Sequence, residues 1–268
     1  MKKAFSTVAC MELTWREALR LAADNGMDAV EIRMDENDRL FGLEEDGLRI
    51  MTDTFDENGI AISDIGSGVC VSGMDDRLLA RAEKSVCTTA KAKAKGMRVF
   101  LGHFLKRFSE QAPCNDPEIC LFLKRLCDFA AEKNVEIWIE THNEYSTGTA
   151  LKRILDGADR DNLKIIWDVI HPAEAREDPA DTLKTLGGRI AHVHLKDGVR
   201  PHDPDIIDYT YTALGKGELP LKRILSLLGD AGYSGYCSLE WEKAWRPEIR
   251  DMYTDTGALL KDYAKLFI

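Results

Sequence analysis

Polar side chains follow four apolar runs of the sequence, at the point where each run ends. The residues are Glu140 after EIWI, Asp168 after KIIW, His194 within HVHL and Glu240 after CSL. Three carboxylates and one imidazole are hard-to-borderline ligands, which suit Mn²⁺, Mg²⁺, Co²⁺ or Zn²⁺. Each carboxylate alone could equally cap a helix or bind a nearby arginine. Together and buried, their like charges would repel unless a cation neutralised them, so the sequence predicts one divalent metal site.

A recurring local pattern indicates the elements that carry these residues. A stretch rich in Ala and charged residues ends in Gly or Asn, and a run rich in Val and Ile follows. Gly or Asn can take the left-handed conformation that ends a helix, and β-branched residues favour a strand. The pattern occurs in Leu21–Arg33, Phe55–Gly66, Ala92–Gly102, Ala130–Glu140, Leu186–Asp197 and Leu228–Glu240. With the runs Ala4–Ala9 and Lys164–Trp167, the sequence predicts eight strands.

Eight strands alternating with helices predict an α/β protein with a (β/α)8 TIM barrel. The chain has 268 residues, which allows about 34 residues for each strand-helix unit, the size expected of such a barrel. The strands are mostly continuous apolar runs, as a sheet covered by helices requires. A doubly wound open sheet would carry a glycine-rich phosphate loop after its first strand, and STVACMELTW has no glycine. No linker divides the chain, so we expect a single TIM-barrel domain over residues 1–268.

The active site of a TIM barrel lies at the carboxyl ends of its strands, and further polar residues occur there. They are His103, His142, Glu144, His171, Lys196 and Arg200. In His192-Val193-His194 both imidazoles point to the same side of the strand, so the spacing does not say which one would bind the metal. Lys106 and Arg107, in a long loop, are equally consistent with phosphate contacts and with a solvated loop surface.

Composition and charge narrow the partners that we expect. Lys and Arg number 36 against 46 Asp and Glu, a net charge of −10, which disfavours nucleic acids and anionic membranes. No apolar run is long enough to span a membrane or to serve as a signal peptide. The seven cysteines include no Cys-x-x-Cys pair, so a disulfide framework is not expected. We therefore expect a reduced, cytoplasmic protein, with a homo-oligomer as an open option.

Three motifs together resemble the xylose-isomerase-like TIM-barrel superfamily. They are Asp168-Val-Ile-His171, HVHLKD followed by Arg200, and the final SLEW. The group includes ketose 3-epimerases, hydroxypyruvate isomerases, inosose dehydratases and apurinic-site endonucleases. The resemblance implies that Glu140, Asp168, His194 and Glu240 hold one divalent ion, and that His171 and Arg200 hold substrate oxygens. Where the epimerases carry a second Glu, this chain has Ser146, and Glu144 is the nearest substitute. His103 and Lys196 complete the expected substrate contacts.

The resemblance also implies a reaction. Glu140 and Glu240 would be the catalytic residues of a sugar or sugar-phosphate isomerase or epimerase that transfers a proton through an enediolate. The alternatives are a lyase of the inosose dehydratase type and a sugar-binding barrel without catalysis. The endonuclease branch needs an Asp-x-His where DYTYTALGKG has Tyr209 and Tyr211, which disfavours DNA repair. We therefore expect a small sugar or polyol as the substrate.

Overall fold

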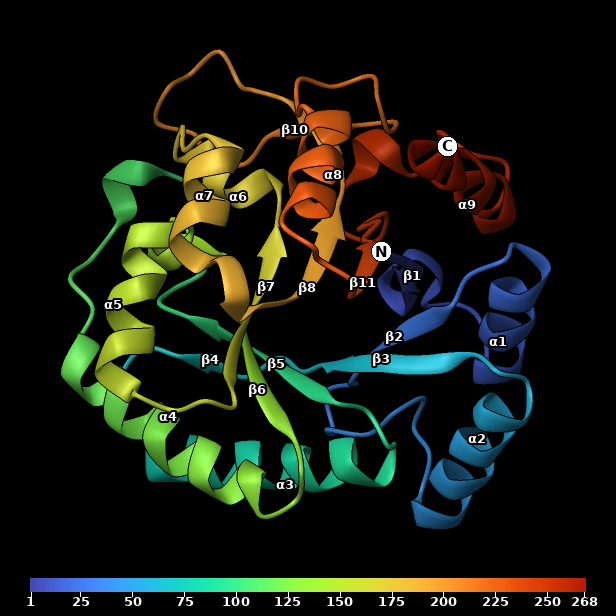
Figure 1. Ribbon diagram of the computed structural model, residues 1–268, viewed down its shortest axis with the longest axis horizontal. Coiled ribbons are helices and arrows are strands. Elements are labelled where there is room, and N and C mark those ends of the chain that lie inside the picture. Colours follow the sequence, from blue (N-terminus) through green and yellow to red (C-terminus); the bar gives the residue numbers. More distant parts are fainter.

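Eight parallel strands close into one barrel in the computed structural model, which describes residues 1–268 (Figure 1). These strands are β1 (Lys2–Ser6), β2 (Ala29–Arg33), β3 (Ala61–Gly66), β5 (Gly96–Leu101), β6 (Glu136–Glu140), β7 (Leu163–Asp168), β8 (Ile190–Leu195) and β11 (Tyr236–Leu239). Their order is β3-β2-β1-β11-β8-β7-β6-β5, and pairing of β3 with β5 closes the ring. The predicted TIM barrel is confirmed.

Three short strands lie outside the barrel at its mouth. Strand β4 (Cys70–Val71) pairs with the end of β5. Strands β9 (Asp197–Val199) and β10 (Thr210–Thr212) form an antiparallel pair after β8. Because they follow the carboxyl ends of barrel strands, these additions shape the rim around the predicted site.

Helices surround the barrel, and at least one follows each barrel strand (Figure 1). They are α1 (Trp15–Asp24), α2 (Glu45–Glu57), α3 (Asp76–Lys91), α4 (Asp116–Ala131), α5 (Gly148–Ala158), α6 (Ile170–Glu174), α7 (Pro179–Leu186), α8 (Leu221–Asp230) and α9 (Thr256–Ala264). Their starts follow from local chemistry: Thr14 and Glu17 form a reciprocal capping box at α1, which satisfies backbone N–H groups that the helix leaves free. The helices bury their apolar sides against the outside of the strands, where most of the hydrophobic core lies.

The first strand differs from its predicted range of Ala4–Ala9. It begins at Lys2 and ends at Ser6, and Thr7–Cys10 form a 3-10 helix. The side chain of Ser6 accepts a hydrogen bond from the backbone N–H of Val8, and such a hydroxyl contact favours a turn over continued pairing. The run of small apolar residues is therefore buried in a turn rather than in the sheet.

The inside of the barrel contains large polar and aromatic side chains. Trp138 on β6 stacks on His192 of β8, with the ring centres 5.8 Å apart. Gly96 on β5 makes room for it, because a Cβ at that position would lie 2.1 Å from the Trp138 ring. This layer fills the barrel below the mouth and forms the base of the predicted site.

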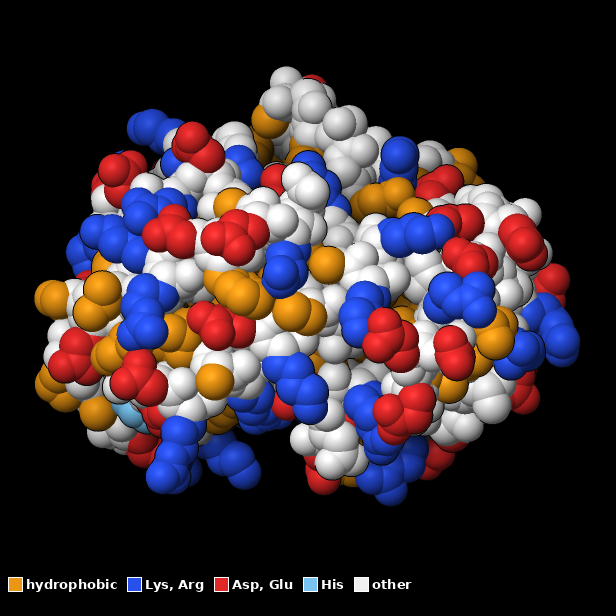
Figure 2. Space-filling view, turned by 90° about the horizontal axis from the view of Figure 1, so that it is seen from below, with side chains coloured by type: hydrophobic (Ala, Val, Ile, Leu, Met, Phe, Trp, Pro, Cys, Tyr) orange, Lys and Arg blue, Asp and Glu red, His pale blue; other side chains and the backbone are white.

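The outer surface carries charges of both signs. Figure 2 views the face over α2, α3 and α4, where Lys and Arg side chains are interspersed with Asp and Glu. No helix of the structure combines the length and the apolar character that crossing a membrane requires. The sequence predicts a small-molecule ligand, and in a TIM barrel we expect such a ligand at the barrel mouth.

Candidate functional site

Four potential metal ligands converge at the ends of neighbouring strands, and we call them the four-ligand cluster. Its members are Glu140 of β6, Asp168 of β7, His194 of β8 and Glu240 directly after β11, all buried. The Nδ1 atom of His194 lies 3.8 Å from Glu140 Oε1, 3.9 Å from Asp168 Oδ2 and 3.3 Å from Glu240 Oε2. The structure therefore brings together the four residues that the sequence proposed as ligands.

The spacing and the unpaired atoms of this cluster fit a divalent cation. Metal–ligand bonds of about 2.0–2.2 Å place neighbouring ligand atoms roughly 3–3.6 Å apart, close to the separations seen here. Glu140 Oε2, Asp168 Oδ2 and His194 Nδ1 are buried and form no hydrogen bond, although the two carboxylate oxygens lie within ion-pair distance of Arg98 and Lys196. Buried polar atoms are rarely left unpaired in proteins, so an ion among them would complete the site.

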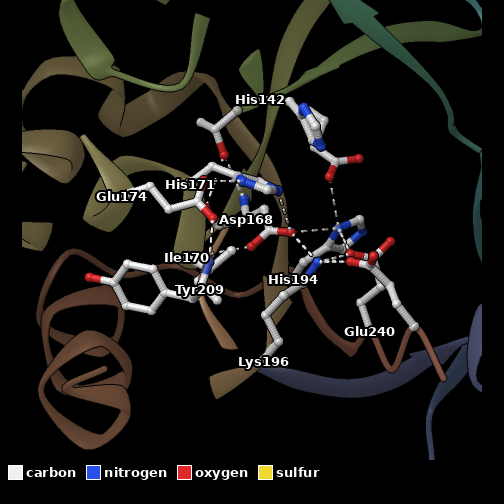
Figure 3. Close-up of polar contacts among 12 residues, drawn as sticks. His142, Asp168, Ile170, His171, Glu174, His194, Lys196, Tyr209 and Glu240 are labelled. Carbon is white, nitrogen blue, oxygen red and sulfur yellow. Dashed lines mark hydrogen bonds and ion pairs between the residues drawn. The ribbon is translucent and has the colours of Figure 1, made fainter. Parts of the chain in front are cut away.

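Two cationic side chains of the chain itself also contact the cluster. Arg98 Nη1 lies 3.0 Å from Glu140 Oε2 and 3.4 Å from Glu240 Oε1. Lys196 Nζ lies 2.7 Å from Asp168 Oδ2 and also contacts Glu240 (Figure 3). Arg98 and Lys196 therefore neutralise part of the negative charge that the sequence analysis assigned to a metal ion.

Lys196 has a further partner, which bears on its predicted role as a substrate contact. Its ammonium group is buried and lies 2.7 Å from Glu242 Oε1. The structure thus places Lys196 among carboxylates at the floor of the site. Because Glu242 would still pair with it, Asp168 and Glu240 can bind a cation without leaving a lysine unpaired.

Burial and the neighbouring charges determine whether the carboxyl groups of the cluster are protonated. Burial alone would raise the pKa of Glu140, but Arg98 outweighs it and lowers that pKa to about 2. Burial raises the pKa of Asp168 to about 6 in spite of the neighbouring Lys196. The pKa of Glu240 is lowered well below its usual value, because Lys196 and His194 outweigh its burial. At neutral pH the carboxylates are therefore ionised, as metal ligands must be.

Glu31 contacts both histidines on β8 and lies closer to His194, the one that faces the cluster. Glu31 Oε2 lies 2.9 Å from His194 Nε2, so the remaining nitrogen, Nδ1, points to the other ligands. His192 lies one layer deeper, where its Nε2 is 2.8 Å from Ser238 Oγ. A carboxylate bound to the far nitrogen of a ligand histidine is a common feature of metal sites. The structure thus favours His194 over His192, which the sequence spacing had left open.

Two further histidines, His142 and His171, lie beside the cluster with their ring centres 4.2 Å apart. His171 Nδ1 is 2.8 Å from Glu174 Oε2 (Figure 3). Burial alone would lower the pKa of His171, but Glu174 and Asp168 raise it to about 9. Burial and the charge on His171 lower the pKa of His142 to about 4. The pair therefore combines one imidazolium and one neutral imidazole at neutral pH.

Arg200, predicted to hold substrate oxygens, does not reach the cluster. Its guanidinium donates hydrogen bonds to the backbone carbonyls of Ala173 (2.6 Å) and Glu174 (3.3 Å) and packs over Tyr209. These carbonyls belong to α6, the helix that carries His171. Arg200 therefore anchors this helix instead of facing the pocket.

His103 and Glu144 also lie apart from the cluster, beside Cys114, and we call these three residues the loop group. Glu144 Oε2 accepts a hydrogen bond from the backbone N–H of His103 at 2.9 Å, and Oε1 lies 3.3 Å from its ring. The 3-10 turn Asn143–Tyr145 directs the Glu144 side chain towards this loop. The structure does not bring these two predicted substrate contacts to the site.

A pocket of about 540 Å³ opens above the four-ligand cluster, a volume suited to a small molecule. Its floor includes Glu140, Glu240 and Arg98, and His142 forms part of its wall. The aromatic side chains of Phe100, Phe104 and Trp245 also line it, together with wall residues that include Val8, Arg33, Met34, Lys106 and Arg246. The cluster is therefore accessible to a ligand from one side.

Sequence reasoning missed Arg98 and Glu242 and gave His142 no role. Arg98 did carry a signal, because it is the one charged residue in the buried strand Gly96–Leu101. An isolated charge in such a strand requires a partner inside the barrel. Glu242 lies two residues after Glu240, and His142 lies two residues after Glu140. Only the conformation of their loops directs these side chains towards the site.

Curated relatives of similar sequence include dehydratases. The chain is 22% identical to 3-dehydroshikimate dehydratase of Bacillus anthracis over 261 residues, which covers 90% of this chain and 91% of that protein. It is 29% identical to inosose dehydratase of Geobacillus thermodenitrificans over 134 residues, or 45% of each protein. These likenesses place dehydratases among its relatives.

Solved structures share the whole fold. The IolI protein with a bound zinc atom superposes with a TM-score of 0.82 at 21% identity, covering 100% of this chain and 96% of that one. D-psicose 3-epimerase of Clostridium cellulolyticum H10, solved with D-tagatose, gives a TM-score of 0.80 at 15% identity, covering 100% and 98%. At these identities the likeness establishes the fold.

A family model gives the most direct assignment. It is described as the xylose isomerase-like TIM barrel, and it matches residues 19–262, most of the chain and all four residues of the cluster. With its closed eight-stranded barrel, the chain belongs to the xylose isomerase-like TIM barrel family.

Proposed function

We propose that this protein is a divalent-metal-dependent isomerase or epimerase of a small sugar or polyol, which acts by transferring a proton next to a carbonyl group. The observation that carries the proposal is the four-ligand cluster at the floor of an open pocket. Enzymes in the family, including the epimerase and dehydratases above, support a catalytic role.

The four ligands would hold the ion, and a bound divalent ion would polarise a substrate carbonyl as a Lewis acid. The chain's own residues supply the proton transfer. Glu140 and Glu240 are ionised and line the pocket, so each has an oxygen that can accept a proton from carbon. If one removes the proton and the other returns one to the opposite face, the carbon is inverted, whereas a single shuttling group gives an isomerase.

Neighbouring groups suit the charge that develops during such a step. An enediolate carries negative charge on oxygen, and Arg98 and Lys196 bring two buried positive charges to the floor. Fixed charges in a site shielded from water stabilise such an intermediate strongly. His142, neutral and in the pocket wall, adds a group that can exchange a proton with a substrate hydroxyl.

A dehydratase is the second candidate, and Lys196 favours it. After the proton leaves carbon, loss of water requires that a C–O bond break and that the departing hydroxyl gain a proton. The Lys196 ammonium lies against Asp168, Glu240 and Glu242 and is a donor of that kind. The dehydratase that aligns with 90% of the chain supports the same reaction.

Deuterium uptake tests the proposal most directly. The purified protein is analysed for metal and then incubated in heavy water with candidate ketoses and cyclic polyol ketones. We expect deuterium at the carbon beside the carbonyl, together with an epimer or isomer of the substrate. A conjugated product that absorbs ultraviolet light would instead establish the dehydratase. Binding of these compounds without any uptake of deuterium would show a non-catalytic sugar-binding barrel and refute both reactions.

A further inference from the structure

Five cationic side chains line the pocket, although the chain as a whole is acidic. They are Arg33, Arg81, Arg98, Lys106 and Arg246. Three of them already have carboxylate partners. Arg81 binds Asp38 at 2.8 Å, Arg98 binds Glu140 at 3.0 Å, and Arg246 binds Asp208 at 3.1 Å. These three charges are therefore neutralised within the protein.

The other two cations, Arg33 and Lys106, have no ionic partner. The Arg33 guanidinium forms neither an ion pair nor a hydrogen bond and lies 5.5 Å from the ring centre of Trp245. The Lys106 ammonium is likewise free, while its backbone carbonyl accepts a hydrogen bond from the N–H of Ile207 at 3.0 Å. A half-buried arginine without a partner inside a pocket is a ready acceptor for an anion.

The fold places Arg33 across the barrel mouth from Asp168 of the four-ligand cluster. Arg33 ends β2, which lies opposite β7, the strand of Asp168, in the ring of eight strands. Lys106 belongs to the loop after β5, which crosses the mouth and pairs with the loop after β9 through Arg107 and Ile206. A ligand that reached both the four-ligand cluster and Arg33 would therefore extend across the barrel mouth.

The acidic residues near Arg33 and Lys106 neutralise little of the positive charge of these two side chains. Asp35 accepts hydrogen bonds from the backbone N–H groups of Asn37 and Arg39, so local contacts occupy its carboxylate. Glu36 lines the outer rim and is exposed to solvent, where water screens its charge. Arg107, the other loop cation that the sequence suggested for phosphate, is bound by Asp203 and Asp205.

We propose that Arg33 and Lys106 form an anion subsite, and that the substrate carries a carboxylate or phosphate group at the end remote from its reacting carbonyl. The substrate assignment rests on the proposed function, whereas the subsite itself does not. A planar guanidinium suits both anions through paired hydrogen bonds, and the lysine adds a second charge. The Trp245 ring supports the guanidinium from the open side.

Anion binding by the full-length protein tests the subsite without any substrate. Inorganic phosphate and acetate are titrated by calorimetry into the protein as purified and after chelation, so that binding common to both excludes the metal as the anion's partner. We expect Arg33→Ala and Lys106→Ala each to weaken binding about tenfold or more, the effect of losing a charged hydrogen bond. Arg33→Lys should restore part of it. Lys84→Gln, an exposed cation on α3 outside every pocket described here, is the matched control and should bind as the wild type does.

The results distinguish the anion subsite from the proposed function, and phosphate from acetate. Tighter binding of phosphate than of acetate identifies a phosphorylated substrate, and the reverse identifies a carboxylic acid. Absence of binding by the wild type, or equal binding by Arg33→Ala and Lys84→Gln, overturns the subsite even if deuterium exchange succeeds. Phosphate or acetate binding that depends on Arg33, in a protein that exchanges deuterium with no ketose, supports the subsite and refutes the proposed function.

Discussion

Two groups of potential metal ligands in this chain have opposite surroundings. The four-ligand cluster is built from four barrel strands, and all of its members are buried. The loop group consists of His103 and Cys114 from the loop between β5 and α4 and Glu144 from the loop after β6, and its histidine is exposed. In both groups the ligand atoms lie within 4.8 Å of one another, so proximity alone does not distinguish them.

The difference lies in what holds and neutralises the charges. Strand pairing fixes the positions of the cluster, and Arg98 and Lys196 compensate its carboxylates. In the loop group, water reaches His103, whose side chain is 48% exposed, and Glu144 is paired with the backbone N–H and the ring of this histidine, with no cationic side chain bound to it. Buried charges are costly without partners, whereas exposed charges are not. The contrast shows why a rigid, buried cluster is the better candidate for catalysis.

The largest expected effect comes from changing one carboxylate in each group. Glu240→Gln should reduce deuterium exchange about 10³-fold, because it removes both a ligand and a proton acceptor. Glu144→Gln, the matched change in the loop group, should alter the rate by no more than about twofold. Exchange rates measured by mass spectrometry test both, with circular dichroism as the check on folding. Comparable losses in the two variants would show that the contrast between the groups is wrong.

A second test concerns the residue that orients His194. Glu31→Gln should lower the metal affinity about 10- to 100-fold, the usual effect of losing the outer partner of a ligand histidine. Ser238→Ala is the control, because the Ser238 hydroxyl that it removes contacts the ring of His192. Competition with a coloured chelator measures both affinities. Unchanged affinity in Glu31→Gln would remove Glu31 from the site.

Removal of the metal should lower the thermal stability of the protein. This effect should depend on the four-ligand cluster and not on the loop group. An ion that binds the folded chain stabilises it by about 2.7 kcal/mol when its free concentration is 100 times the dissociation constant. We expect a melting temperature several degrees higher with metal than after chelation. This shift should disappear in Asp168→Asn and persist in His103→Ala. A shift that follows His103 would instead locate the ion in the loop group.

The last prediction separates buried thiols from half-buried ones. Burial raises the pKa values of Cys10, Cys127 and Cys237 to about 12, whereas thiols in an unfolded chain ionise near pH 8.5. The unfolded state therefore holds fewer protons above that pH, and stability falls as the pH rises, by up to about 1.4 kcal/mol per unit for each thiol.

Urea unfolding between pH 8 and pH 10 measures this slope. The slope should become shallower in Cys127→Ala, which removes one buried thiol. Cys87→Ser, at a half-buried position on α3, is the comparison. An identical slope in the wild type and in Cys127→Ala would refute the contribution of buried thiols.

Much of the fold was predictable because its signals are local. Each helix end and each apolar strand can be recognised within about a dozen residues, and seven of the eight predicted strand segments contain the observed strand or most of it. The exception is the first strand, where Ser6 binds its own backbone and ends the strand early. A side-chain hydroxyl competing with the sheet is not visible in an apolar pattern.

Part of the candidate site was predictable for the same reason. Glu140, Asp168 and Glu240 mark strand ends, and parallel strands in a barrel bring their carboxyl ends together. The directions of loop side chains were not predictable. Arg200 turns to the carbonyls of α6 and Glu144 turns to His103, because contacts formed only in the folded chain determine where each side chain points.

The amino-acid sequence by itself determined the barrel and the four residues that we propose as ligands, since hydrophobic period and strand ends are properties of short segments. Only the tertiary structure decided how their charges are balanced. Arg98 and Glu240 are 142 residues apart, and His194 and Glu31 are 163 apart. Such partners meet only after the barrel closes. The energy of a buried charge depends on everything that surrounds it in space, so a short segment of sequence does not determine it.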